Sequence, residues 1–232
     1  MKLKWTEEEE RYFEKNADEK EKMTALENAF EAQAWSVVDW IVARGVNPQN
    51  SYGYMVWDAV KGQDLGLLKK LISYNCNVRL IEDVAFRDAV KLKSLEMAKV
   101  LKEAGADPKA VNSTAMTLAA ENNDVAMIKQ LAEWGVSYFG WQNEPLISAV
   151  GKGAMDAAKL LVEMGANFED EKEFYMPIRY TLCEDNEDMG KFVLKHTKNI
   201  EEVMTRLETF DAYLPENWKI KLDKWRLSMT IA

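Results

Sequence analysis

The sequence repeats itself with a period of thirty residues, and this periodicity constrains the fold more than any single motif. When the chain is divided into blocks of thirty, four columns each keep one type of residue through five successive blocks. The columns hold alanine (Ala29, Ala59, Ala89, Ala119, Ala149), an aliphatic residue (Ile41, Leu71, Leu101, Leu131, Leu161), glycine or asparagine (Gly45, Asn75, Gly105, Gly135, Gly165), and a small polar residue (Asn47, Asn77, Asp107, Ser137, Asn167). Such blocks are expected to stack, because none can bury its apolar face alone.

Each block carries the signals of two helices joined by a short turn. The alanine column places a small side chain in the first helix, where neighbouring helices can approach closely. Asp64, Ser94 and Asp124 precede the second helix, and their side-chain oxygens can accept from its first free amides. The second helix has apolar residues at helical spacing and ends at the glycine or asparagine column, because these residues tolerate a left-handed conformation. The sequence therefore predicts an all-α fold of helix–turn–helix units.

Motifs at the block ends resemble the ankyrin repeat. LKEAGAD (101–107) and LVEMGAN (161–167) match the end of the family's second helix, and EPLISA (144–149) matches the opening of its first. The resemblance covers about residues 21–200. The histidine of the family's opening motif is absent, and its column reads Glu27, Trp57, Arg87, Thr117, Ile147. The period is also shorter than the usual ~33, which predicts that the family's projecting hairpin is trimmed to a short loop between Gly105 and Thr114.

The predicted architecture is one ankyrin-like solenoid of about six repeats with a helical cap at each end. Residues 1–22 are expected to form a charged capping helix with Thr6 as its N-cap, and residues 201–232 to form C-terminal capping helices. The sixth repeat is slipped by about one residue and lacks the glycine. The repeats are placed at about 23–50, 51–80, 81–110, 111–140, 141–170 and 171–200.

The last helix has an apolar stripe among basic residues. Trp218, Leu222, Trp225 and Met229 are spaced for one helical face. We interpret this helix as a lid over the last repeat, because a solenoid needs its end covered. Contact with a membrane surface or a partner is the alternative.

Composition and chemistry argue against several classes of function. A formal net charge of −9 and a pI near 4.9 disfavour nonspecific nucleic-acid binding, which needs clustered basic residues. The sequence shows no secretory signal and no long apolar run, so we expect a cytoplasmic protein without membrane contact. Cys76, Cys183 and His196 form no catalytic or metal-binding motif. We predict no enzymatic activity, no cofactor and no metal.

Candidate binding residues are those that depart from their own columns. Phe139 lies in an otherwise polar column beside Tyr138 and Trp141, and Tyr52 is a second aromatic outlier. Exposed aromatic residues often dominate binding interfaces. On the first helices, Trp57 and Arg87 replace the missing histidine. The predicted partner-binding residues are Tyr52, Trp57, Asp58, Arg87, Asp88, Tyr138, Phe139 and Trp141.

Much of the negative charge is concentrated near the end of the repeats. The predicted acidic patch comprises Glu169, Asp170, Glu171, Glu173, Glu184, Asp185, Glu187 and Asp188. It can steer a basic protein toward the chain, or it can simply be a solvated end surface. By contrast, the regular lysines of the second helices (Lys69, Lys99, Lys129, Lys159) indicate a solvated outer face.

The resemblance implies a concave binding face, built from first helices and loops, that binds other proteins. The sequence therefore favours a small non-catalytic adaptor or inhibitor, of bacterial, phage or viral type, with a protein partner that is basic. Oligomeric state stays open, with a monomer favoured. Two alternatives remain: binding of a small cationic ligand or modified peptide, and self-assembly of a structural protein through its end faces.

Overall fold

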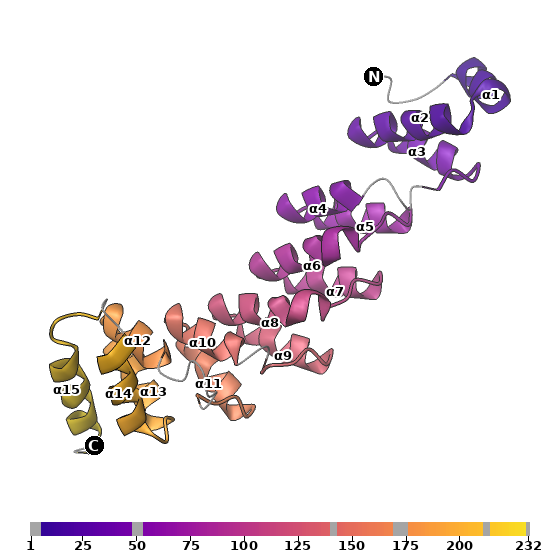
Figure 1. Ribbon diagram of the computed structural model, residues 1–232. Coiled ribbons are helices and arrows are strands. Elements are labelled where there is room, and N and C mark those ends of the chain that lie inside the picture. The colour runs from indigo at the N-terminus through magenta and orange to yellow at the C-terminus, as the bar shows by residue number, and fades with distance from the viewer. Residues whose placement is uncertain (1–5, 48–52, 140–142, 169–175, 211–213, 231–232) are drawn as a thin grey trace. The chain divides into compact units, whose positions relative to one another are not determined.

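The computed structural model describes residues 6–47, 53–139, 143–168, 176–210 and 214–230 (Figure 1). Throughout these residues the regular structure is helical and no strand occurs, so the all-α prediction is confirmed. The chain forms two compact units. The first comprises residues 1–89 and 96–107, and the second comprises residues 90–95 and 108–232.

The helices of the first unit follow the expected pairs. They are α1 (Glu7–Asn16), α2 (Glu19–Glu31), α3 (Trp35–Val42), α4 (Gly53–Lys61) and α5 (Leu65–Ser73), with most of α6 (Leu80–Lys91) and α7 (Leu95–Glu103). The N-terminal charged segment, expected as one helix to residue 22, is divided in two. The physical reason is a second capping box, in which Asp18 accepts from the Glu21 amide at 2.8 Å while Glu21 accepts from the Asp18 amide.

The second unit contains the remaining helices. They are α8 (Ala110–Glu121), α9 (Val125–Glu133), α10 (Glu144–Gly151), α11 (Met155–Glu163), α12 (Met176–Cys183), α13 (Glu187–Lys195), α14 (Ile200–Phe210) and α15 (Trp218–Thr230). First helices pack side by side in the order α8, α10, α12, and each of them also packs on the second helix of its own pair. This is the layered arrangement that the thirty-residue period predicts.

The repeated alanine and aliphatic columns lie in the core of each unit. Every alanine of the repeated column is at most 2% exposed, and every member of the aliphatic column is fully buried. Burying one leucine or isoleucine side chain contributes about 1.5–3 kcal/mol. The lysines at 69, 99, 129 and 159 are all exposed, which agrees with a solvated outer face.

The turns use the predicted residues and one further set. Asp64 and Asp124 cap α5 and α9 by accepting from the Leu67 and Met127 amides at 2.8 and 3.0 Å. The whole glycine or asparagine column has positive φ. A second positive-φ column between paired helices holds Gln33, Gln63, Lys93, Asn123 and Gly153, and its varied residue types hid it from sequence comparison.

The sixth repeat is displaced further than expected. Its positive-φ residue in this turn is Asp185, which lies 32 positions after Gly153 rather than thirty. Asn186 then caps α13 by accepting from the Met189 amide at 3.1 Å. The slip is therefore two residues, where the sequence suggested about one.

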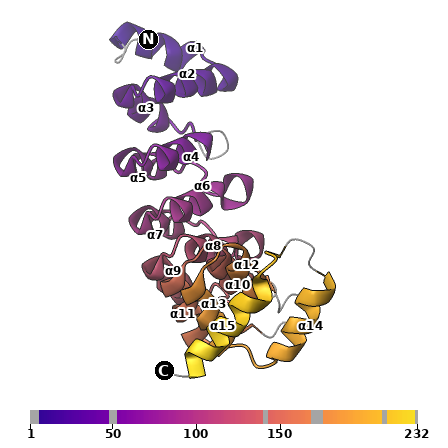
Figure 2. The same cartoon turned by 90° about the vertical axis from the view of Figure 1, so that its left-hand side faces the viewer.

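The C-terminal helix α15 packs on α13 and α12 (Figure 2). Leu222 and Trp225 of the apolar stripe are buried, and the Trp225 indole lies directly over Gly190 of α13. A β-carbon built on Gly190 would lie 2.3 Å from Cζ3 of Trp225, so only glycine fits beneath this ring. This packing agrees with the lid interpretation.

Four ion pairs surround that packed face. They are Lys219–Glu208 (2.6 Å), Lys221–Asp185 (2.7 Å), Arg226–Glu201 (3.3 Å) and Lys224–Glu187 (3.7 Å). The basic residues of α15 thus engage carboxylates of their own chain. Because these pairs lie at the surface, we expect each to contribute little to the stability of the fold.

Candidate binding surfaces

The first candidate surface lies in the first unit and is centred on Trp57. Its indole Nε1 donates to Oδ2 of Asp88 at 2.6 Å, which links α4 to α6. Lys61 follows one helical turn later on α4 and places its ammonium 4.4 Å from the centre of the indole ring. Both Trp57 and Asp88 are half-buried. Two predicted residues are therefore brought together, and a cation already rests on the aromatic ring.

Asp58 and Tyr54 complete the exposed part of this surface. Asp58 is exposed, and its carboxylate has no hydrogen bond or ion pair within the described parts of the chain. Tyr54 lies four residues before Asp58 on α4, so both share one helical face, and Tyr54 is 56% exposed. Sequence analysis missed Tyr54. Tyr54 could have been found as an aromatic outlier, because its column otherwise holds Thr24, Val84, Thr114 and Glu144. We call Tyr54, Trp57, Asp58, Lys61 and Asp88 the Trp57 surface.

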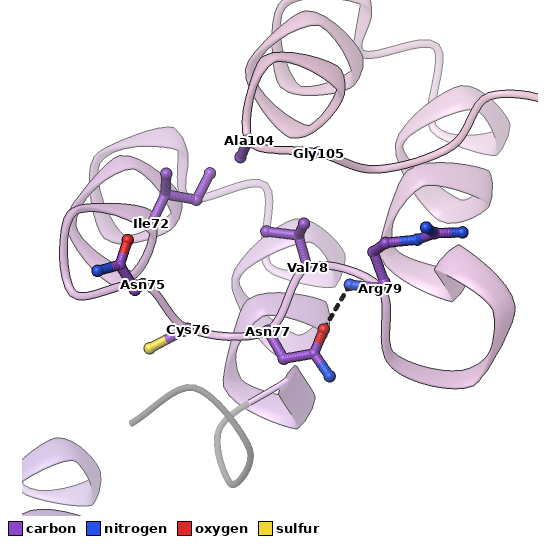
Figure 3. A pocket seen from close by; sticks show the side chains of 8 residues that line it. All are labelled: Ile72, Asn75, Cys76, Asn77, Val78, Arg79, Ala104 and Gly105. Atoms are coloured by element: carbon purple, nitrogen blue, oxygen red, sulfur yellow. Dashed lines mark hydrogen bonds between the residues drawn. The ribbon is translucent and has the colours of Figure 1, made fainter. Parts of the chain in front are cut away.

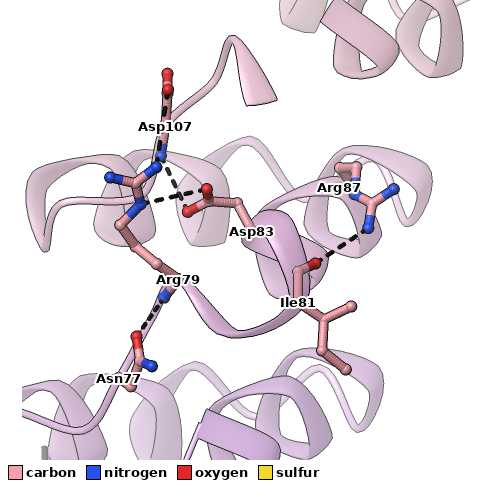
Figure 4. Close-up of polar contacts among 6 residues, drawn as sticks. All are labelled: Asn77, Arg79, Ile81, Asp83, Arg87 and Asp107. Carbon is pink, nitrogen blue, oxygen red and sulfur yellow. Dashed lines mark hydrogen bonds and ion pairs between the residues drawn. The ribbon is translucent and has the colours of Figure 1, made fainter. Parts of the chain in front are cut away.

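Arg87 donates a hydrogen bond to a turn of its own chain (Figure 4). Ile81, Glu82 and Asp83 all have positive φ, so the first turn of α6 is left-handed. Nη2 of Arg87 donates to the Ile81 carbonyl at 3.3 Å. The side chain of Ile81 is 54% exposed at this turn. This left-handed turn lies one period before the segment, between Gly105 and Thr114, for which the sequence predicted a short loop.

A buried carboxylate, that of Asp83, fixes this turn, and the residue is 1% exposed. Its Oδ1 accepts from the Asp107 amide at 3.1 Å, and its Oδ2 accepts from Nε of Arg79 at 3.4 Å. Arg79 also lies 3.9 Å from the Asp107 carboxylate, and its amide donates to Oδ1 of Asn77 (Figure 4). Nothing in the sequence pattern marked Asp83, because an aspartate in a loop is ordinarily solvated.

The second candidate surface lies in the second unit, on the loop after α9. Tyr138 and Phe139 have ring centroids 4.5 Å apart. Tyr138 is half-buried, and its hydroxyl lies 3.8 Å from where a β-carbon on Gly165 would be, so it covers the next turn. Phe139 is 41% exposed. Trp141, predicted beside them, and Tyr52 both lie outside the described residues.

The predicted acidic patch is described only in part. Glu169, Asp170, Glu171 and Glu173 lie outside the described residues. Glu184 and Asp188 are exposed, whereas Asp185 and Glu187 bind lysines. The Lys191 ammonium, 2.8 Å from Glu187, holds the pKa of that carboxyl below its usual range, and Lys224 adds to the effect. Half of the described patch is thus paired within the chain.

A pocket of about 460 Å³ lies between the turns that follow α5 and α7 (Figure 3). It is lined by Ile72, Asn75, Cys76, Asn77, Val78, Arg79, Ala104 and Gly105. Cys76 is 4% exposed, and burial raises the pKa of its thiol to about 12. The thiol therefore stays protonated at neutral pH, and Cys76 packs as a small buried apolar residue.

The two cysteines should differ in their rate of alkylation. At pH 8 a thiol with a pKa of about 12 is ionised in roughly one molecule in ten thousand. We expect iodoacetamide to modify the exposed Cys183 at least ~100-fold faster than Cys76 in the folded protein, measured by peptide mass spectrometry. In urea the two rates should converge. Equal rates without urea would contradict the burial of Cys76.

The described residues contain neither a metal-binding cluster nor a membrane-spanning helix. Among them, no cluster of three or more His, Cys, Asp or Glu side chains is arranged to hold a metal ion. None of the described helices has the length and apolar character needed to cross a membrane.

Comparison with known proteins identifies part of the chain. Residues 86–172 match the family model described as ankyrin repeats (3 copies). No curated protein matches the sequence. Ankyrin repeats generally mediate protein–protein interactions. The matched segment contains the blocks in which the alanine, leucine and glycine columns are kept without exception. Residues 86–172 are therefore similar to ankyrin repeats, the family that the motifs of the sequence resemble.

Proposed function

We propose that this chain is a non-catalytic adaptor or inhibitor that binds a protein partner. The observation that carries the proposal is the exposure of aromatic side chains on surfaces whose columns are otherwise mostly small or polar. Tyr54 is 56% exposed and Phe139 is 41% exposed. Aromatic residues of this kind each contribute about 2 kcal/mol or more when they become central to an interface.

The two candidate surfaces support the proposal independently. The Trp57 surface belongs to the first unit, and the Tyr138–Phe139 loop belongs to the second. Each departs from the repeat pattern, so the packing needs of the repeat do not explain it. In contrast, the second helices α5, α7, α9 and α11 each present an exposed lysine at the same position of the repeat. We therefore assign partner binding to the first helices and the loops. The lysine-bearing face of the second helices is assigned to contact with solvent.

Affinity capture from the organism that encodes the chain tests this function. The tagged protein should retain one protein partner in stoichiometric amount, identified by mass spectrometry. Trp57→Ala or Phe139→Ala should lower its recovery about ten-fold, because each removes an aromatic contact. Lys129→Ala, on the exposed face of α9, is the matched control and should leave recovery unchanged.

Two outcomes would overturn the proposal, and a third would reject the two candidate surfaces. Recovery of no protein would remove the binding function. Recovery of additional copies of the chain alone would indicate self-assembly. Equal recovery by the wild type and both aromatic variants, with circular dichroism showing that all are folded, would show that neither surface binds the partner.

A further inference from the structure

We infer that the Trp57 surface binds an arginine- or lysine-bearing segment of the protein partner. The inference rests on the proposed function and adds the chemistry of the partner. It is carried by the meeting of three features in the first unit: an aromatic ring that already holds a cation, an unpaired carboxylate beside it, and an exposed tyrosine on the same helical face.

The indole ring of Trp57 already makes a contact with a cationic group. Nζ of Lys61 lies 4.4 Å from the centre of the Trp57 indole, within the range of a cation–π contact. Lys61 itself is exposed, so this contact is weak and exchangeable. Lys61 thus occupies the position that a cationic side chain of the partner would take. When the partner binds, the Lys61 side chain can be displaced into solvent.

The neighbouring carboxylates favour the same charge. Asp58 follows Trp57 directly and is exposed without a polar partner in the described parts of the chain. Asp88 uses Oδ2 to accept from the indole and keeps Oδ1 without a hydrogen bond to any described residue. An arginine guanidinium can stack on an aromatic face while donating to a carboxylate, a combination that suits Trp57 and Asp58.

The surroundings do not favour an acidic partner. The guanidinium of Arg87, one residue before Asp88 on α6, donates to the Ile81 carbonyl of its own chain. Tyr54 lies one turn before Asp58 and offers an apolar surface for the methylene stem of an incoming arginine or lysine. A negatively charged segment would instead meet Asp58 and Asp88 beside the ring.

The test uses the full chain and a defined probe, the peptide acetyl-GRGRGRG-amide. Binding is followed by ¹⁵N NMR at the indole N–H of Trp57, assigned by its loss in Trp57→Phe. We expect this signal to shift with saturation. The dissociation constant should rise at least about three-fold in Asp58→Asn, and acetyl-GEGEGEG-amide should leave the signal unmoved.

The decisive variant is Lys61→Ala, which removes the internal competitor. It should tighten binding of the arginine peptide about three-fold relative to Lys102→Ala. Lys102 is an exposed lysine of α7 in the same unit, so its variant makes the same change in net charge away from the ring. Equal affinities of the two variants, or an indole signal that the arginine peptide does not shift, would overturn the inference.

Failure of this inference and failure of the proposed function can be told apart. Recovery of a protein partner that depends on Trp57, together with no response to the arginine peptide, would reject the cationic ligand and keep the interaction function. A Trp57-dependent response to the peptide, with no protein recovered by affinity capture, would reject the function and keep the site.

Discussion

Replacing Gly190 by alanine should destabilise the second unit by about 2–3 kcal/mol, a large effect for one methyl group. The added β-carbon would lie 2.3, 2.5 and 2.9 Å from Cζ3, Cε3 and Cη2 of Trp225. These atoms belong to a rigid indole that is 2% exposed, so the ring cannot turn aside. Helix α15 must shift as a whole, and the burial of Leu222 is then reduced as well.

Urea denaturation followed by circular dichroism measures this cost, and a double-mutant cycle identifies its cause. Trp225→Ala alone should cost about 3–5 kcal/mol. In that background Gly190→Ala should be neutral or stabilising by up to about 1 kcal/mol, because alanine is the better helix former. An equal cost of Gly190→Ala in both backgrounds would show that the indole is not responsible.

Gly151 provides the matched glycine control. It ends α10, and a β-carbon there would lie 3.4 Å from Cδ2 of Tyr180, an ordinary van der Waals distance. Gly151→Ala should therefore change the free energy of unfolding by less than about 1 kcal/mol. A loss as large as that of Gly190→Ala would indicate a general sensitivity of helix glycines instead of the specific contact with Trp225.

The repeated core was predictable because one physical constraint fixes each column. Ala119 lies where first helices approach closely, Leu131 fills the space between layers, and Gly135 has positive φ at the end of α9. The Gly190–Trp225 contact was not predictable in this way. It occurs once, at the end of the repeats, and depends on how α15 crosses α13, which no repeating column records.

The candidate surfaces were predictable only in part. Trp57 stood out as a replacement for the family's histidine, whereas Asp88 shares a polar column with Asn28, Asp58 and Ser148. The hydrogen bond between Trp57 and Asp88 depends on the spacing of α4 and α6, which no column records. The charge count of the acidic segment was misleading in part, because Lys221 and Lys224 return from the C-terminal helix to pair with it. Asp83 gave no signal, since its burial follows from the left-handed turn.

Replacing Arg79 by alanine should destabilise the first unit by about 2–3 kcal/mol, because it leaves a buried carboxylate with a single donor. Asp83 is 1% exposed and accepts from Nε of Arg79 and from the Asp107 amide. Asp83→Asn should cost only about 1 kcal/mol, because the amide oxygen can still accept from Asp107 and no charge remains buried. The buried member of the pair therefore sets the cost, although Arg79 itself is 58% exposed.

The double variant gives this argument its sharpest test, again by urea denaturation. Asp83→Asn should stabilise the Arg79→Ala protein by about 1 kcal/mol, although the same change destabilises the wild type, because it removes the uncompensated charge. Lys69→Ala breaks the ion pair with Glu96, in which both side chains are more than half exposed, and should cost less than about 0.5 kcal/mol. If Asp83→Asn lowered the free energy of unfolding equally with and without Arg79, the guanidinium would not be stabilising the buried carboxylate. The left-handed turn that contains Ile81 would then depend on the Asp107 amide alone.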